Sequence, residues 1–139
     1  MKKSIILFLI LILFSCESTT IKNNSSEDIE KAKKLTNNFY EDLEKNDTIL
    51  IYNYLDHSIS KVEFNKLIVT NNKEFGHIKE IKIVSIDTKS IITKNSIKSD
   101  YKISIDVMYE KTNVLEYLLF EKTNSTDFKL SKYLIQNPL

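Results

Sequence analysis

The chain has no arginine, and it has only one cysteine, one glycine and one proline among its 139 residues. The guanidinium group of arginine is the usual reader of phosphates and guanine edges, so its absence argues against a nucleic-acid partner. A glycine-rich phosphate loop or a nucleophile elbow needs several glycines, and Gly76 is the only one. The sequence therefore indicates no bound cofactor. The many lysines fit a codon bias and carry no functional argument.

The most specific signal lies in the first sixteen residues. Lys2 and Lys3 precede an unbroken apolar run over residues 5–14. A membrane-spanning helix needs roughly 20 apolar residues, so this shorter run matches the apolar region of a signal peptide instead. The run ends at Leu13-Phe14-Ser15-Cys16, which resembles the lipobox of bacterial lipoproteins.

This resemblance implies that residues 1–15 are a signal peptide and that Cys16 becomes a lipidated N-terminus. Two or more acyl chains anchor a protein stably, whereas one chain binds a bilayer only marginally. We therefore expect a lipid-anchored protein of the cell envelope, on the periplasmic face or in the outer membrane. The alternatives are an ordinary cleaved signal peptide or an uncleaved anchor, with Cys16 uninvolved. With Cys16 lipidated, the mature chain has no thiol for a disulfide, a metal site or a nucleophile.

The remaining 124 residues are enough for one domain and carry 18 lysines against 19 acidic residues, a net charge near −1. Residues 17–26 are polar and show no periodicity, so residues 16–26 are predicted to be the lipidated Cys16 followed by a flexible tether. A single α+β domain is expected over residues 27–139.

Three helices are predicted in the first half of the domain. The first follows a capping arrangement at Ser25 and carries apolar residues at helical spacing to about residue 45. A second, shorter helix follows Asn46, and a third begins at Ser60. The third should end at Gly76, because glycine adopts the left-handed conformation that often ends helices.

After Gly76 the apolar period changes from 3.6 to 2, which predicts strands. A long first strand begins at Ile78 with a bulge near Val84, and the second alternates cleanly from Tyr101 to Tyr109. The sequence thus predicts an α+β fold in which three N-terminal helices pack on one face of a curved, four-stranded antiparallel meander.

Two turns set the predicted pairing of the last three strands. A two-residue turn at residues 112–113 would pair Val107 with Leu118. A three-residue turn centred on Asn124 would pair Leu118 with Leu130. Both hairpins then share one apolar face.

One ordered set of apolar and turn positions comprises Ala32, Phe39, Tyr40, Leu43, Asn46, Asp47, Tyr54, Leu55, Phe64, Leu67, Phe75 and Gly76. Followed by a curved meander, this pattern resembles the nuclear-transport-factor-like, or cystatin-like, superfamily of cone-shaped α+β domains, over roughly residues 27–135. The resemblance implies a cone-shaped fold. That superfamily includes isomerases, dehydratases, binding modules and transport factors, so it implies no single function.

The predicted register brings Tyr109, Glu116 and Lys132 together at the rim of the cone as candidate pocket residues. The alternative is a cross-strand ion pair beside a tyrosine, which stabilises by at most ~1 kcal/mol. His57 and His77 lack the i, i+4 spacing of helical metal ligands, so no metal site is predicted. No catalytic residue is predicted either. The pattern favours a non-catalytic ligand- or protein-binding module, with a small isomerase- or hydrolase-like enzyme using the cone pocket as the alternative.

The opposite face of the predicted sheet is also apolar. It carries the candidate interface residues Met108, Leu115, Tyr117 and Leu119, with Tyr133 beside them. Contiguous apolar patches often mark interaction sites, so this face is a candidate surface for a homodimer or a protein partner. The alternatives are that the first strand or the C-terminal tail covers these residues, or that they are scattered.

Overall fold

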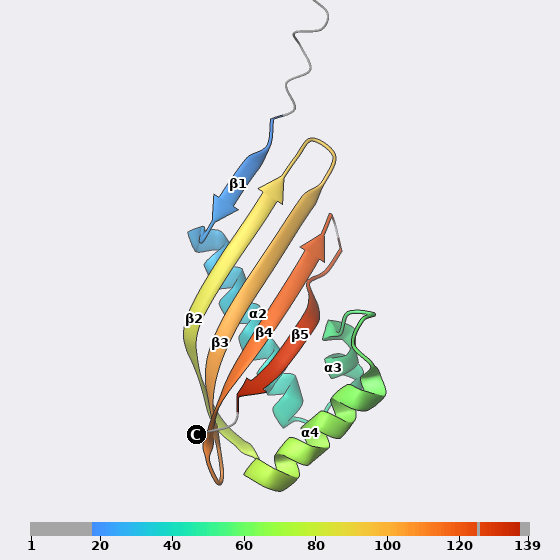
Figure 1. Ribbon diagram of the computed structural model, residues 1–139, viewed down its shortest axis with the longest axis vertical. Helices are drawn as coiled ribbons and strands as arrows, with labels where there is room; N and C mark the ends of the chain where they lie inside the picture. Colours follow the sequence, from blue (N-terminus) through green and yellow to red (C-terminus); the bar gives the residue numbers. More distant parts are fainter. Residues whose placement is uncertain (1–17, 125, 137–139) are drawn as a thin grey trace, which may run out of the picture.

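The computed structural model describes residues 18–124 and 126–136, which form an α+β fold (Figure 1). The helices are α2 (Ser26–Glu44), α3 (Thr48–Tyr54) and α4 (Lys61–Phe75). The antiparallel sheet has the order β1 (Thr20–Asn23), β2 (Ile78–Ile92), β3 (Ile97–Tyr109), β4 (Asn113–Thr123) and β5 (Lys129–Gln136). None of these helices has the length and hydropathy that crossing a bilayer requires. The predicted signal peptide and Cys16 lie outside the described residues.

The helices begin close to the predicted positions because each N-terminus has its capping side chain. The side chains of Ser25, Asp47 and Ser60 each accept a hydrogen bond from a backbone N–H in the first turn of α2, α3 and α4. Asn46, with φ of 53°, separates α2 from α3. Gly76 follows α4 with φ of 85°, as predicted.

Strand β1 corrects the prediction of a flexible tether and makes the sheet five-stranded instead of four-stranded. Thr20–Asn23 pairs with the end of β2 over residues 89–92. Asn24, with φ of 50°, then turns the chain into α2. Its side chain accepts a hydrogen bond from the Thr88 N–H at 2.7 Å, and its own N–H donates to the Thr88 carbonyl at 2.9 Å. The β-branched residues of this segment are its sequence signal for a strand.

The core lies between α2 and the sheet, and the predicted stacking of three helices on one face is only partly correct. Figure 1 shows α2 behind the sheet, whereas α3 and α4 lie beside β5. Phe39 of α2 joins these parts, because its ring centre lies 5.5–6.4 Å from aromatic rings of α3, α4, β4 and β5. The fully buried apolar side chains include Ala32, Phe39, Ile105, Val107, Phe120 and Leu130.

The turn between β3 and β4 lies two residues earlier than predicted. The hydrogen bond across it closes residues 110–111, not residues 112–113. Val107 therefore pairs with Val114, and not with Leu118. Because the turn moves by two residues, an even number, each side chain stays on its predicted face of the sheet. Every β4 residue, however, lies further from the turn than predicted.

The connection between β4 and β5 is longer than the predicted three-residue turn at Asn124. Leu130 pairs with Phe120, and not with Leu118. A bulge beside Phe120 then inserts one extra residue in β5 and changes which of its side chains face the core. Tyr133 consequently faces inward, although the sequence placed it on the outer face. The predicted bulge near Val84 is confirmed by a register shift at that position of β2.

Candidate functional site

The three residues predicted at the rim of the cone do not come together. The Tyr109 hydroxyl donates a hydrogen bond to the Glu116 carboxylate at 2.6 Å, so that contact is confirmed. Lys132 pairs with Leu119 and is exposed on the opposite face of the sheet. The shifted β4 register also places Glu116 opposite Ile105, in the middle of the strand and away from its end.

Glu116 is instead the centre of a buried cluster, which we call the Glu116 cluster, with Tyr40, Tyr109 and Tyr133. Tyr40 and Tyr133 donate hydrogen bonds to one carboxylate oxygen at 2.6 and 2.5 Å, while Tyr109 donates to the other. The four residues come from α2, β3, β4 and β5. Burial raises the pKa of the Glu116 carboxyl, and the three phenols only partly offset this. Burial, together with the nearby Glu116 charge, raises the pKa of all three phenols.

The geometry of this cluster suits structure better than catalysis. Glu116 is 0% exposed, and three phenolic donors already occupy its oxygens. Glu116 and Tyr40 line none of the three surface hollows described below. A further hollow of about 260 Å³ beside α4 and β5 is lined by Tyr133, but not by Glu116. A substrate has no open path to this carboxylate in the present conformation. The cluster joins α2 to three strands through groups whose polar atoms are mutually satisfied.

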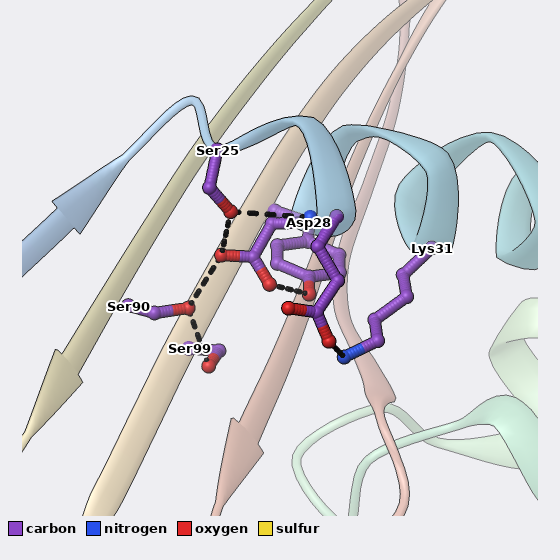
Figure 2. A network of polar contacts seen from close by, with 7 residues as sticks. Ser25, Asp28, Lys31, Ser90 and Ser99 are labelled. Carbon is purple, nitrogen blue, oxygen red and sulfur yellow. Dashed lines mark hydrogen bonds and ion pairs between the residues drawn. The ribbon is translucent and has the colours of Figure 1, made fainter.

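A second carboxylate network, which the sequence analysis did not predict, lies at the start of α2 (Figure 2). The carboxylate of Asp28 accepts hydrogen bonds from Ser25 at 2.8 Å, Ser90 at 3.2 Å and Tyr101 at 2.7 Å. The hydroxyls of Ser90 and Ser99 are 2.8 Å apart. Burial raises the pKa of Asp28, but the three hydroxyl donors lower it more, so the net pKa lies below the usual 3.8.

The Asp28 network borders a hollow of about 220 Å³ at one end of the sheet. Three lysines, Lys22, Lys31 and Lys122, line it together with Asp28 and Tyr101. The capping pattern of Ser25 and Asp28 was visible in the sequence. The partners of Asp28 in the sheet could not be found that way, because they lie more than 60 residues along the chain.

A larger cleft of about 760 Å³ opens between α3, the loop after it and the β4–β5 connection. Its lining includes three carboxylates, three lysines and one histidine, namely Asp56, Glu121, Asp127, Lys61, Lys98, Lys129 and His57. The volume falls within the range of small-molecule sites, roughly 300–1,000 Å³. We call this the α3 cleft.

Backbone contacts fix the shape of the α3 cleft. Leu55 forms a parallel bridge with Leu130, and the Asp56 N–H donates to the Leu130 carbonyl at 2.9 Å. Lys129 donates to the Asn53 carbonyl at 2.5 Å. The backbone hydrogen bond from Ser58 lowers the pKa of Asp56, so this carboxylate is ionised at neutral pH. The backbone bonds to Leu130 and the side-chain bond from Lys129 join the end of α3 to β5, so the cleft is pre-formed.

The four candidate interface residues lie on the outer face of the sheet, as predicted. Met108 is 41% and Tyr117 is 36% exposed, while Leu115 and Leu119 are half-buried. Leu134, paired with Tyr117, adds a further exposed apolar side chain at 48%. A hollow of about 270 Å³ lies over this part of the face. Strand β2 continues the sheet beside β3 and does not cover the patch.

In residues 18–124 and 126–136, no group of three or more His, Cys, Asp or Glu side chains is placed to hold a metal ion. No protein-family model, curated protein or solved structure matches this chain. The site must therefore be interpreted from its own geometry and chemistry.

Proposed function

We propose that this protein is a lipid-anchored component of the cell envelope whose domain binds a ligand without transforming it. The anchor is lipid on Cys16, after removal of residues 1–15. The ligand site is the α3 cleft. A small isomerase- or hydrolase-like enzyme would need an acid or base in reach of substrate inside the cone.

The observation that carries this proposal is the contrast between a closed interior and an open cleft. Glu116, the carboxylate on the inward face of the sheet, is fully buried and saturated by phenols. The α3 cleft is open and has fixed walls. Its lining alternates lysines with carboxylates, which suits a polar ligand that carries both charges, such as a short peptide or an amino acid.

The position of β1 supports close attachment to a membrane. Thr20, its first residue, is four residues after Cys16. Four residues span at most about 14 Å when fully extended. An acylated Cys16 would therefore keep the sheet close to the lipid surface, much closer than a long flexible tether would.

The anchor is tested by growing cells that express the full chain or its Cys16→Ala variant with labelled palmitate. The wild type should take up label and sediment with membranes, whereas the variant should do neither. Equal labelling of the variant contradicts lipidation at Cys16.

The ligand site is tested by titrating the protein with amino acids and charged dipeptides while recording amide and imidazole NMR signals. Binding should shift His57 and its neighbours in the α3 cleft and leave the Glu116 cluster unchanged. Lys98→Glu should abolish these shifts, whereas the matched surface change Lys79→Glu should not. Turnover of any of these compounds, or shifts centred on Tyr109, would favour the enzyme alternative.

A further inference from the structure

The end of the sheet at which β1 begins has an unusual composition. We call it the sheet tip and define it as residues 20–22, 90–99 and 122–124, from the ends of β1 to β4 and the β2–β3 turn. It contains no aspartate or glutamate. Its lysines and isoleucines are Lys22, Lys94, Lys98, Lys122, Ile21, Ile91, Ile92 and Ile97.

Five of these eight side chains are exposed, whereas Ile91, Ile92 and Lys122 are half-buried. Ile21 is 56% and Ile97 is 42% exposed, and Lys22, Lys94 and Lys98 are exposed. The three ion pairs found among the described residues lie on α2 and its C-cap residue Lys45, and none uses a lysine of the sheet tip. Glu27, which lines the same hollow as Lys22, is paired with Lys31 at 2.6 Å.

The charge of the sheet tip is local and does not reflect the whole protein. The mature chain is near neutral, with 18 lysines against 19 acids, yet the strand and turn segments of the sheet tip carry four lysines and no acid. The acids beside them, Glu27 and Asp28, belong to α2 and line the hollow that Lys22 and Lys122 also line. Exposed lysines beside exposed aliphatic side chains are the combination that binds an anionic lipid surface, because the lysines meet phosphates and the aliphatic groups enter the interface.

The segment between Cys16 and β1 is also short enough to keep the sheet tip near a bilayer. β1 lies beside the β2–β3 hairpin at the upper end of the view in Figure 1. Since Thr20 is at most about 14 Å from Cys16, a lipid on Cys16 brings the sheet tip within reach of phospholipid headgroups.

We infer that the sheet tip docks on the surface of an anionic phospholipid bilayer and fixes the orientation of the domain. This inference rests on the proposed lipidation of Cys16. Docking holds the β2–β3 turn against the headgroups and directs the β3–β4 turn, at the other end of the sheet, away from the membrane.

The test uses the acylated full-length product, purified from membranes and reconstituted into vesicles of phosphatidylglycerol and phosphatidylcholine. Because Cys16 is the only cysteine, Asn95→Cys at the tip and Asn113→Cys at the opposite end each add a single labelling site. A fluorophore on residue 95 should be shielded from acrylamide in the water and quenched by lipid-borne quenchers, whereas one on residue 113 should be neither.

Charge reversal then separates docking from anchoring. Lys22→Glu with Lys94→Glu should weaken docking on the order of 100-fold, since each lysine near an anionic surface contributes about a fivefold factor and each glutamate opposes it. Residue 95 should become accessible while the protein stays in the vesicle pellet. The control pair Lys79→Glu and Lys111→Glu, at the opposite end of the sheet, should change nothing.

The outcomes distinguish the two claims. Equal accessibility of residues 95 and 113, or shielding of residue 95 that persists in pure phosphatidylcholine and in the charge-reversed variant, overturns docking and leaves the anchor standing. Reaction of wild-type Cys16 with maleimide shows a free thiol and overturns both the proposed anchor and the docking that depends on it.

Discussion

Replacing Glu116 by leucine is expected to destabilise the fold through the tyrosines around it. The substitution leaves the buried hydroxyls of Tyr40, Tyr109 and Tyr133 without their acceptor. An unsatisfied buried donor costs about 1–3 kcal/mol, so the three together should lower the free energy of unfolding by about 3 kcal/mol or more. Urea denaturation followed by circular dichroism measures this change.

The decisive variant removes the hydroxyls as well. Replacing both partners of a buried hydrogen bond by apolar groups can be nearly neutral, whereas removing one partner is costly. Glu116→Leu combined with phenylalanine at the three tyrosine positions should therefore be about 2 kcal/mol more stable than Glu116→Leu alone. Tyr52→Phe is the control, since the Tyr52 hydroxyl makes no hydrogen bond within the described residues. A combined variant no more stable than the single one would refute the cluster as the source of the cost.

The same cluster predicts a pH dependence of stability. Because the pKa of Glu116 in the folded protein is raised above its usual 4.5, the folded state holds the proton more tightly than the unfolded chain does. The stability contributed by this group is present below pH 4.5 and is lost as the pH rises through the raised pKa. Glu116→Gln does not titrate and should lack this loss. Wild-type and Glu116→Gln stability curves that run parallel above pH 4.5 would contradict the assignment.

Three further substitutions test other parts of the structure. Gly76→Val should cost more than about 1 kcal/mol, because φ at residue 76 is 85° and an added Cβ would lie 2.7 Å from the Glu110 Cβ. A Glu110→Gly background removes that contact, so the remaining cost there is the φ penalty, and its disappearance would contradict the backbone assignment. Asp28→Ala should lower the free energy of unfolding, measured by chemical denaturation, by at least about 2 kcal/mol. Because the pKa of Asp28 is lowered in the folded protein, the greater stability of the wild type should be present above pH 3.8 and fade as the pH falls below it. Tyr117→Lys on the outer face should keep the free energy of unfolding within about 0.5 kcal/mol of the wild-type value. It should convert a self-associated domain to monomer in analytical ultracentrifugation. A monomeric wild type together with a destabilised variant would contradict the interface.

The helices and their ends were predictable because their signals are local. A capping side chain acts on a backbone N–H two or three residues away, so Ser25, Asp47 and Ser60 can be recognised within one turn. The positive φ of Gly76 follows from glycine being the residue that tolerates it best. The inward face of β3 was equally clear, because its alternation spans the whole strand.

The strand registers were not predictable from the same pattern. A turn moved by two residues buries the same side chains, so hydrophobic alternation cannot distinguish residues 110–111 from residues 112–113. The bulge in β5 places Tyr133 on the inner face of the sheet instead of the predicted outer face. No glycine or proline in that strand indicates a bulge.

The error in register hid the character of Glu116. Its hydrogen bond to Tyr40 joins residues 76 positions apart, and a contact of that separation depends on the tertiary packing of α2 against β4. A single acid among the inward positions of an apolar strand, with tyrosines on inward positions of neighbouring elements, is the pattern that would have indicated a buried cluster.

The intact mass of the protein purified from membranes decides whether lipid on Cys16 holds this domain to a membrane. We expect a chain that begins at Cys16 and carries a diacylglyceryl group and an amide-linked acyl chain. A chain that retains residues 1–15, or one that begins at another residue with no added lipid, would contradict it.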